Sequence, residues 1–121
     1  MRSLLLILQS ETVWIWLAAA AFFAGGIVNA TGVSKIRDSF TDLGFPAWWC
    51  WITGALELAT AFLLLIPASR AYGVALGACI MIAALAAILR QKAYGHLPAP
   101  LLFLFLLVPA GISHHVWTLF Y

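Results

Sequence analysis

Charged side chains are almost missing from this sequence of 121 residues. Lysine, arginine, aspartate and glutamate make up 8% of it, whereas a soluble domain carries about a quarter. Hydrophobic residues make up 65%. So few charges cannot cover a surface that faces water, and we therefore expect lipid around the chain. The basic residues are scattered, which excludes the clustered basic face of a nucleic-acid-binding protein.

Cysteine is also scarce, and the two that occur form no C-x-x-C pair. In a tight hairpin about Ala68, the residue level with Cys50 is near Ala87. Cys79 would then lie roughly 12 Å too deep in the membrane for a disulfide with Cys50. We expect both cysteines to stay reduced, buried and packed as small hydrophobic side chains.

Signatures of catalysis and of metal binding are missing too. His114 and His115 are adjacent and point to different helix faces, and His96 lies in another loop, so the three predict no metal site. No phosphate loop, catalytic triad or dinucleotide signature is present. We expect no catalytic activity of the chain's own, and no cofactor is evident from these patterns.

Four apolar stretches follow one another, each near the roughly 20 residues that cross a bilayer. They cover residues 13–33, 47–66, 71–89 and 98–117. They leave little room for a soluble domain. The predicted fold class is all-α, a single transmembrane domain over residues 1–121 with four transmembrane helices in an antiparallel bundle. Arg2 precedes the first apolar run, and we interpret this end as an uncleaved signal anchor.

A short polar segment separates the first two stretches. Residues 34–43 read SKIRDSFTDL, in which Ile36, Phe40 and Leu43 share one helical face. This pattern predicts a short amphipathic helix at the membrane interface. Gly44 follows at the position where a left-handed helix cap is expected.

Small residues four apart occur in two of the predicted spans. Gly26 and Ala30 have this spacing in the first span, and Gly73 and Gly77 form a GxxxG pattern in the third. In lipid, such pairs let helix backbones approach closely. The pattern does not say whether the neighbouring helix belongs to the same chain or to a second copy.

The aromatic residues support four spans, because Trp and Tyr gather at both membrane interfaces. One group falls on the side of the termini: Trp14, Trp16, Tyr72, Trp117 and Tyr121. The other falls on the side of the first and third loops: Trp48, Trp49, Trp51 and Tyr94. These two loops also carry most of the basic residues: Lys35, Arg37, Arg90 and Lys92, against Arg2 and Arg70 on the other side. The positive-inside rule then puts both loops in the cytoplasm and both termini outside.

Glu57 is the ionisable residue inside the second span, where a charge costs at least ~2.5 kcal/mol. It needs a polar partner, a proton or a ligand. Asn29 lies at comparable depth in the first span, and Thr53 and Thr60 share the helix face of Glu57. These residues predict a binding site that faces the bundle interior. The alternative is that the carboxyl of Glu57 only holds two helices together. Lys35 joins the site only if the first span dips deeper, and otherwise it stays at the interface.

A series of short motifs runs through residues 20–89: Gly32 to Lys35, Leu43-Gly44-Phe45-Pro46, Glu57-Leu58, Leu63-Leu64-Leu65-Ile66 and Arg70-x-x-Gly73. In this order and spacing they resemble the DoxX-like family of small four-helix bacterial membrane proteins. Members named for that family are associated with quinone-linked sulfur oxidation or terminal oxidase complexes. The resemblance implies a bacterial inner-membrane location and raises a quinone as a cofactor.

Three functions remain open. The first is a DoxX-like accessory of a quinone-linked redox complex, or a binder of a small apolar molecule near Glu57. The second is a proton-coupled transporter of the small multidrug-resistance kind, although the essential glutamate of those proteins lies in span one, where this chain has none past Glu11. The third is a membrane scaffold that dimerises through Gly73 and Gly77. The expected partners are the lipid bilayer and either a second copy or other membrane subunits, with no nucleic acid.

Overall fold

The computed structural model describes residues 11–111, and this part of the chain is helical and has no strands. The α-helices are α2 (Glu11–Ala30), α3 (Ser34–Asp42), α4 (Trp49–Leu65), α5 (Arg70–Gln91) and α6 (Pro98–Gly111). Two 3₁₀ turns, η1 (Pro67–Ser69) and η2 (Tyr94–His96), join α4 to α5 and α5 to α6. The predicted all-α class is confirmed. Arg2, His114, His115, Trp117 and Tyr121 lie outside the described residues.

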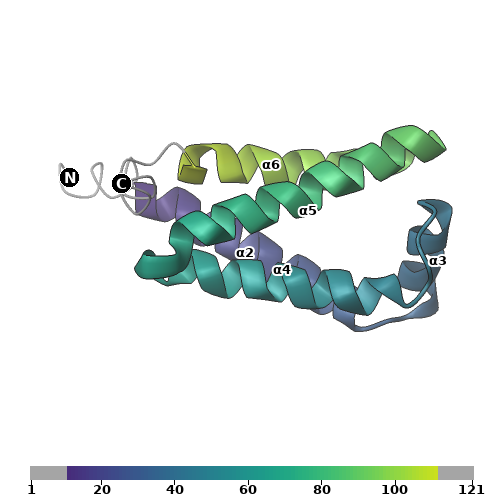
Figure 1. Ribbon diagram of the computed structural model, residues 1–121, viewed down its shortest axis with the longest axis horizontal. Coiled ribbons are helices and arrows are strands. Elements are labelled where there is room, and N and C mark those ends of the chain that lie inside the picture. The colour runs from purple at the N-terminus through teal and green to yellow at the C-terminus, as the bar shows by residue number, and fades with distance from the viewer. Residues whose placement is uncertain (1–10, 112–121) are drawn as a thin grey trace.

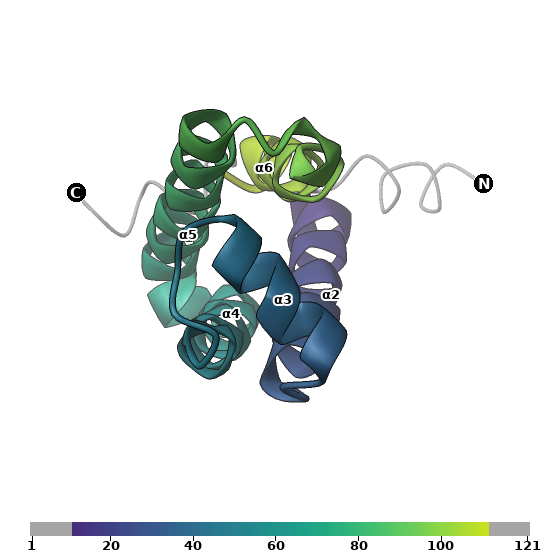
Figure 2. The ribbon, with the colours of Figure 1, turned by 90° about the vertical axis from the view of Figure 1, so that its right-hand side faces the viewer.

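The four longer helices are joined in a ring of contacts. Helix α2 packs against α4 and α6, and α5 packs against the same two helices. The α2–α4 pair and the α5–α6 pair lie close together near η1 and diverge toward the opposite end (Figure 1). Seen from that opposite end, α3 lies across the space between the pairs (Figure 2). The molecule thus has a closed half near η1 and an open half near α3.

Small residues explain the close approach of α2 and α4. A Cβ built on Gly54 of α4 would lie 2.8 Å from the backbone nitrogen of Ala30 and 2.9 Å from the carbonyl oxygen of Gly26. No side chain larger than hydrogen fits there without a shift of backbone. The packing expected from the spacing of Gly26 and Ala30 is therefore confirmed, and the partner is α4.

The GxxxG pattern of α5 also packs inside the chain. A Cβ on Gly73 would lie 2.9 Å from the backbone nitrogen of Leu64, and one on Gly77 would lie 3.0 Å from Cγ2 of Thr60. Both glycines are buried against α4. The scaffold hypothesis needed this face for a second copy, and that use of the two glycines is wrong because α4 already occupies the face.

The tight turn between α4 and α5 satisfies the end of α4. The last carbonyls of a helix have no partner within it. Here the Ser69 hydroxyl donates to the Leu63 carbonyl at 3.1 Å, and the Arg70 guanidinium donates to the carbonyls of Leu64 and Leu65 at 2.8 and 3.4 Å. Arg70 therefore acts as a helix cap as well as a charge.

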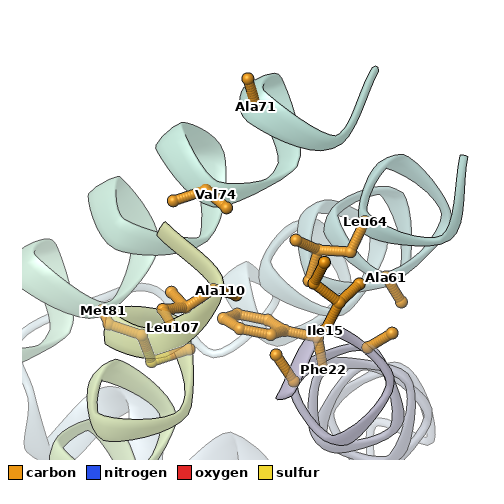
Figure 3. Packing of buried hydrophobic residues seen from close by; sticks show 11 residues of the cluster. Ile15, Phe22, Ala61, Leu64, Ala71, Val74, Met81, Leu107 and Ala110 are labelled. Atoms are coloured by element: carbon orange, nitrogen blue, oxygen red, sulfur yellow. The ribbon is translucent and has the colours of Figure 1, made fainter. Parts of the chain in front are cut away.

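The closed half holds the hydrophobic core, whose side chains come from α2, α4, α5 and α6 (Figure 3). Phe22 is fully buried at its centre and meets Phe103 edge to face at 5.0 Å. The outer surface is apolar as well: the large exposed side chains include Trp16, Phe23, Phe62, Tyr72, Leu102 and Phe105. Soluble monomers rarely show so much contiguous apolar surface. Helices α2 and α5 are long and apolar enough to cross a membrane, and α4 and α6 are shorter apolar helices.

The amphipathic helix after the first span is confirmed as α3. Gly44 ends it in the left-handed conformation (φ 88°), and the Phe45 N–H returns to the Phe40 carbonyl at 3.0 Å. Helix α3 contacts α4, yet none of its residues is buried. Its apolar face must therefore border a space within the open half.

Candidate functional site

A cavity of about 760 Å³ occupies the open half of the molecule. All four long helices contribute to its wall, α3 contributes Ile36 and Phe40, and Leu43 contributes from the connection that follows α3. Most of the lining is aliphatic or aromatic, and the polar exceptions are Asn29, Ser39, Thr53, Glu57 and His96. A mostly apolar pocket of this size with a few polar groups is typical of small-molecule sites.

Glu57 and Asn29 meet at the wall of this cavity. The Asn29 side-chain amide donates to Oε1 of Glu57 at 2.6 Å, and Glu57 is 4% exposed. The close contact of α2 and α4 at Gly26 and Gly54 brings the two residues to the same depth. The expected juxtaposition of Asn29 and Glu57 is confirmed, whereas their part in binding stays a prediction.

The second carboxyl oxygen of Glu57 faces the cavity. A Cβ built on Gly25 would lie 2.5 Å from Oε2 and 3.1 Å from the ring of Phe103, so Gly25 leaves the room that this oxygen occupies. Within residues 11–111, Oε2 accepts no hydrogen bond. Every side-chain oxygen or nitrogen there that is completely buried has a hydrogen-bond partner. Oε2 must therefore be open to the cavity, where it can meet a polar group of a ligand.

The two predicted threonines have different surroundings. Thr53 lies one turn before Glu57 on α4 and lines the cavity. Thr60 is fully buried away from the cavity lining, and its hydroxyl donates to the Leu56 carbonyl of its own helix at 2.9 Å. The structure thus brings Asn29, Thr53 and Glu57 together at the cavity, whereas Thr60 packs against α5.

Lys35 is exposed on α3 and does not belong to the cavity lining. Helix α2 ends at Ala30, before the predicted end of the first span, and a turn separates it from α3. Nothing in the described part of the chain pairs Lys35 with Glu57. The interfacial alternative for Lys35 agrees with this position.

The cysteines are free, as the depth argument predicted. Cys50 is fully buried, but Cys79 is exposed and lines the cavity. The expectation that Cys79 is buried is wrong. The reason is that α5 diverges from α4 toward the open half (Figure 1), and Cys79 borders the cavity there.

Sequence reasoning missed the aromatic part of the wall. Phe40 of α3, Trp49 of α4 and Phe103 of α6 line the cavity, and Phe45 stacks on Trp49 at 6.1 Å. The apolar face of α3 was a usable signal, because an amphipathic helix over a bundle end needs something to cover. His96 also lines the cavity, yet residues 11–111 contain no group of three or more His, Cys, Asp and Glu side chains that could hold a metal.

Comparison with known proteins places the chain in a family. Searches of curated proteins and of solved structures found no match. A model of the DoxX-like family matches residues 13–110, which include the cavity and nearly all of the described helices. Together with the apolar outer surface and the two long apolar helices, this match shows that the chain is a membrane protein and belongs to the DoxX-like family.

Proposed function

We propose that this DoxX-like membrane protein binds a small, largely apolar molecule in its cavity, with a polar group of that molecule at Oε2 of Glu57. One observation carries the proposal: an almost wholly apolar cavity has a buried carboxyl at its wall with one oxygen free. Ionisable residues inside membranes are costly, and they mark functional sites more often than structural ones. Asn29 orients the carboxyl, which leaves Oε2 for the ligand.

The chemistry of Glu57 limits the ligand. An ionised Oε2 accepts a hydrogen bond from a hydroxyl, a phenol or an amine, and a protonated carboxyl donates one to a carbonyl. Phe103 and Trp49 add aromatic side chains to the lining of the cavity. A quinone and its quinol present these carbonyl and phenol groups on an apolar body. The proposal therefore includes the role that family membership suggests, an accessory of a quinone-linked redox complex without catalytic activity of its own.

The proposal includes a topology with four spans, α2, α4, α5 and α6, as one transmembrane domain. The exposed aromatics support it: Trp16 and Tyr72 lie near the closed end, and Trp48, Trp51 and Tyr94 near the open end. Helix α4 has 17 residues and is about 25 Å long, slightly less than the ~30 Å hydrocarbon core, a difference that local thinning accommodates. The termini then share the outer side, with α3 and η2 in the cytoplasmic interface. Reporter fusions at both ends would test this orientation.

The test compares the parent, Glu57→Gln and Thr60→Val, all purified in mild detergent. Copurifying molecules are identified by mass spectrometry, and binding of a short-chain quinone is followed by quenching of tryptophan fluorescence, since Trp49 lines the cavity. We expect Glu57→Gln to keep its thermal stability, because an amide still pairs with Asn29, and to bind the quinone about tenfold more weakly. Thr60→Val is the matched control, because Thr60 is buried on the same helix and bonds only to its own backbone. A Glu57→Gln protein that binds like the parent would leave Glu57 as packing only.

The transporter hypothesis is the second candidate, and the free oxygen of Glu57 in a cavity that reaches the surface at Cys79 favours it. In proteoliposomes, a transporter moves protons when a lipophilic cation is added, and Glu57→Gln abolishes that movement. A binding protein retains the quinone and moves no protons. The two assays therefore separate the two functions.

A further inference from the structure

A second hollow, of about 410 Å³, lies outside the cavity at the end of α5. One side is formed by the connection between α3 and α4, with Leu43 and Phe45, and the other by alanines of α5. Arg90 and Gln91 close its end. We call this hollow the Arg90 groove. It is a separate space, although Leu43, Phe45 and Ala83 also line the main cavity.

Small residues shape the groove. Ala83, Ala86 and Ala87 lie three and four apart, so they form one smooth face of α5. Gly44 faces them across the groove, and a Cβ there would lie 2.9 Å from the side-chain nitrogen of Gln91. The glycine lets the Gln91 amide approach the connection closely, at the polar end of an otherwise apolar channel.

Arg90 brings an unused positive charge to that end. It is exposed in the last turn of α5, and within residues 11–111 its guanidinium has neither an ion pair nor a hydrogen bond. The exposed rings of Trp48 and Tyr94 lie at the same end of the molecule, which is typical of the membrane interface. The groove therefore has a cationic end at the interface and an apolar face toward the hydrocarbon.

We infer that the Arg90 groove binds an anionic phospholipid of the bilayer. Arg90 and the Gln91 amide would hold the head-group phosphate, because guanidinium and amide N–H groups both donate to phosphate oxygens. An acyl chain would lie on Ala83, Ala86 and Ala87, where apolar contact replaces contact with bulk lipid. Basic pockets between membrane helices recognise anionic head groups by this combination of charge and apolar surface.

The experiment is native mass spectrometry of the full chain in mild detergent, titrated with phosphatidylglycerol or with phosphatidylcholine of the same acyl chains. We expect the parent to bind one phosphatidylglycerol in preference to phosphatidylcholine. Arg90→Gln should weaken phosphatidylglycerol binding about tenfold, the effect of losing one charge-assisted phosphate contact. Arg37→Gln is the matched control, because it removes the same charge from an exposed site on α3 outside the groove.

A second variant tests the apolar part. Ala86→Phe places a ring over the groove without changing the charge, and Ala86 is exposed, so the helix tolerates the larger side chain. We expect it to weaken binding of phosphatidylglycerol while Arg90 is intact. Inorganic phosphate in millimolar excess should not displace the lipid.

Three results would overturn the inference: no head-group preference in the parent, equal losses in Arg90→Gln and Arg37→Gln, or full displacement by inorganic phosphate. The last would mean that the site takes a free anion. Glu57→Gln should keep the phosphatidylglycerol preference, because Glu57 does not line the groove. Failure of this inference is therefore distinguishable from failure of the ligand site proposed at Glu57.

Discussion

Replacement of Gly54 by alanine tests the contact on which the site depends. The added Cβ would lie 2.8 Å from the nitrogen and 3.2 Å from the Cα of Ala30, and 2.9 Å from the oxygen of Gly26. All three atoms belong to the backbone of α2 and cannot rotate away. Since ordinary contacts lie at 3.4–4 Å, α2 and α4 must separate by roughly half an ångström or more.

The magnitude follows from two opposing terms. Overpacking of a rigid contact costs about 1–3 kcal/mol. Alanine stabilises the interior of a helix by about 1 kcal/mol relative to glycine. We therefore expect Gly54→Ala to lower the free energy of unfolding by up to about 2 kcal/mol, the difference between the two terms. The separation should also stretch the 2.6 Å bond between Asn29 and Glu57 and weaken ligand binding.

The assay is an unfolding titration with a denaturing detergent in mixed micelles, followed by tryptophan fluorescence. Gly95→Ala is the matched control, because a Cβ on Gly95 has no atom within 4 Å, and its unfolding free energy should stay within about 0.5 kcal/mol of the parent. If Gly54→Ala matched the parent in stability and in ligand binding, the close approach of α2 and α4 would not be what positions the site.

The remaining predictions concern single side chains. Cys79 should react with a membrane-permeant maleimide while folded Cys50 does not, and a bound ligand should slow the reaction; equal labelling of both thiols would contradict the open wall at α5. Arg70→Gln should lower the unfolding free energy by about 1 kcal/mol, because it removes two bonds to the carbonyls at the end of α4; unchanged stability would mean that solvent replaces this cap. Gly25→Ala should weaken ligand binding more than it lowers stability, because its Cβ meets side chains of the cavity wall, the flexible end of Glu57 and the ring of Phe103, and no backbone atom is among its three nearest contacts; a large loss of stability without a change in binding would argue against this.

Several features of the fold follow from local properties, and for this reason they could be predicted. Helix α3 was recognisable from the face shared by Ile36 and Phe40, and its end from Gly44, because periodicity and backbone conformation depend on neighbours in the sequence. The meeting of Asn29 with Glu57 was predictable as well. Residues of antiparallel apolar helices occupy depths that follow from the 1.5 Å rise, and polar groups at one depth avoid lipid by facing each other.

Other features depended on how the helices are rotated and tilted, which depth does not specify. Thr53 and Thr60 share a helix face in the sequence pattern, yet Thr53 lines the cavity and Thr60 packs against Gly77 of α5, because α5 lies close to α4 near η1 and diverges from it toward the other end (Figure 1). Gly73 and Gly77 indicated close packing, but only the folded chain showed that the neighbour is α4.

By itself, then, the sequence determined the solvent, the helices and the buried acid, since these follow from composition, periodicity and the cost of charge in lipid. The tertiary structure alone decided where the cavity is. Helix α5 packs closely on α4 through Gly73 and Gly77 in the closed half, and the α5–α6 pair diverges from the α2–α4 pair toward the opposite end (Figure 1). That divergence opens the space beside Glu57 and exposes Cys79. Because it results from packing between segments far apart in the chain, local sequence patterns do not determine it.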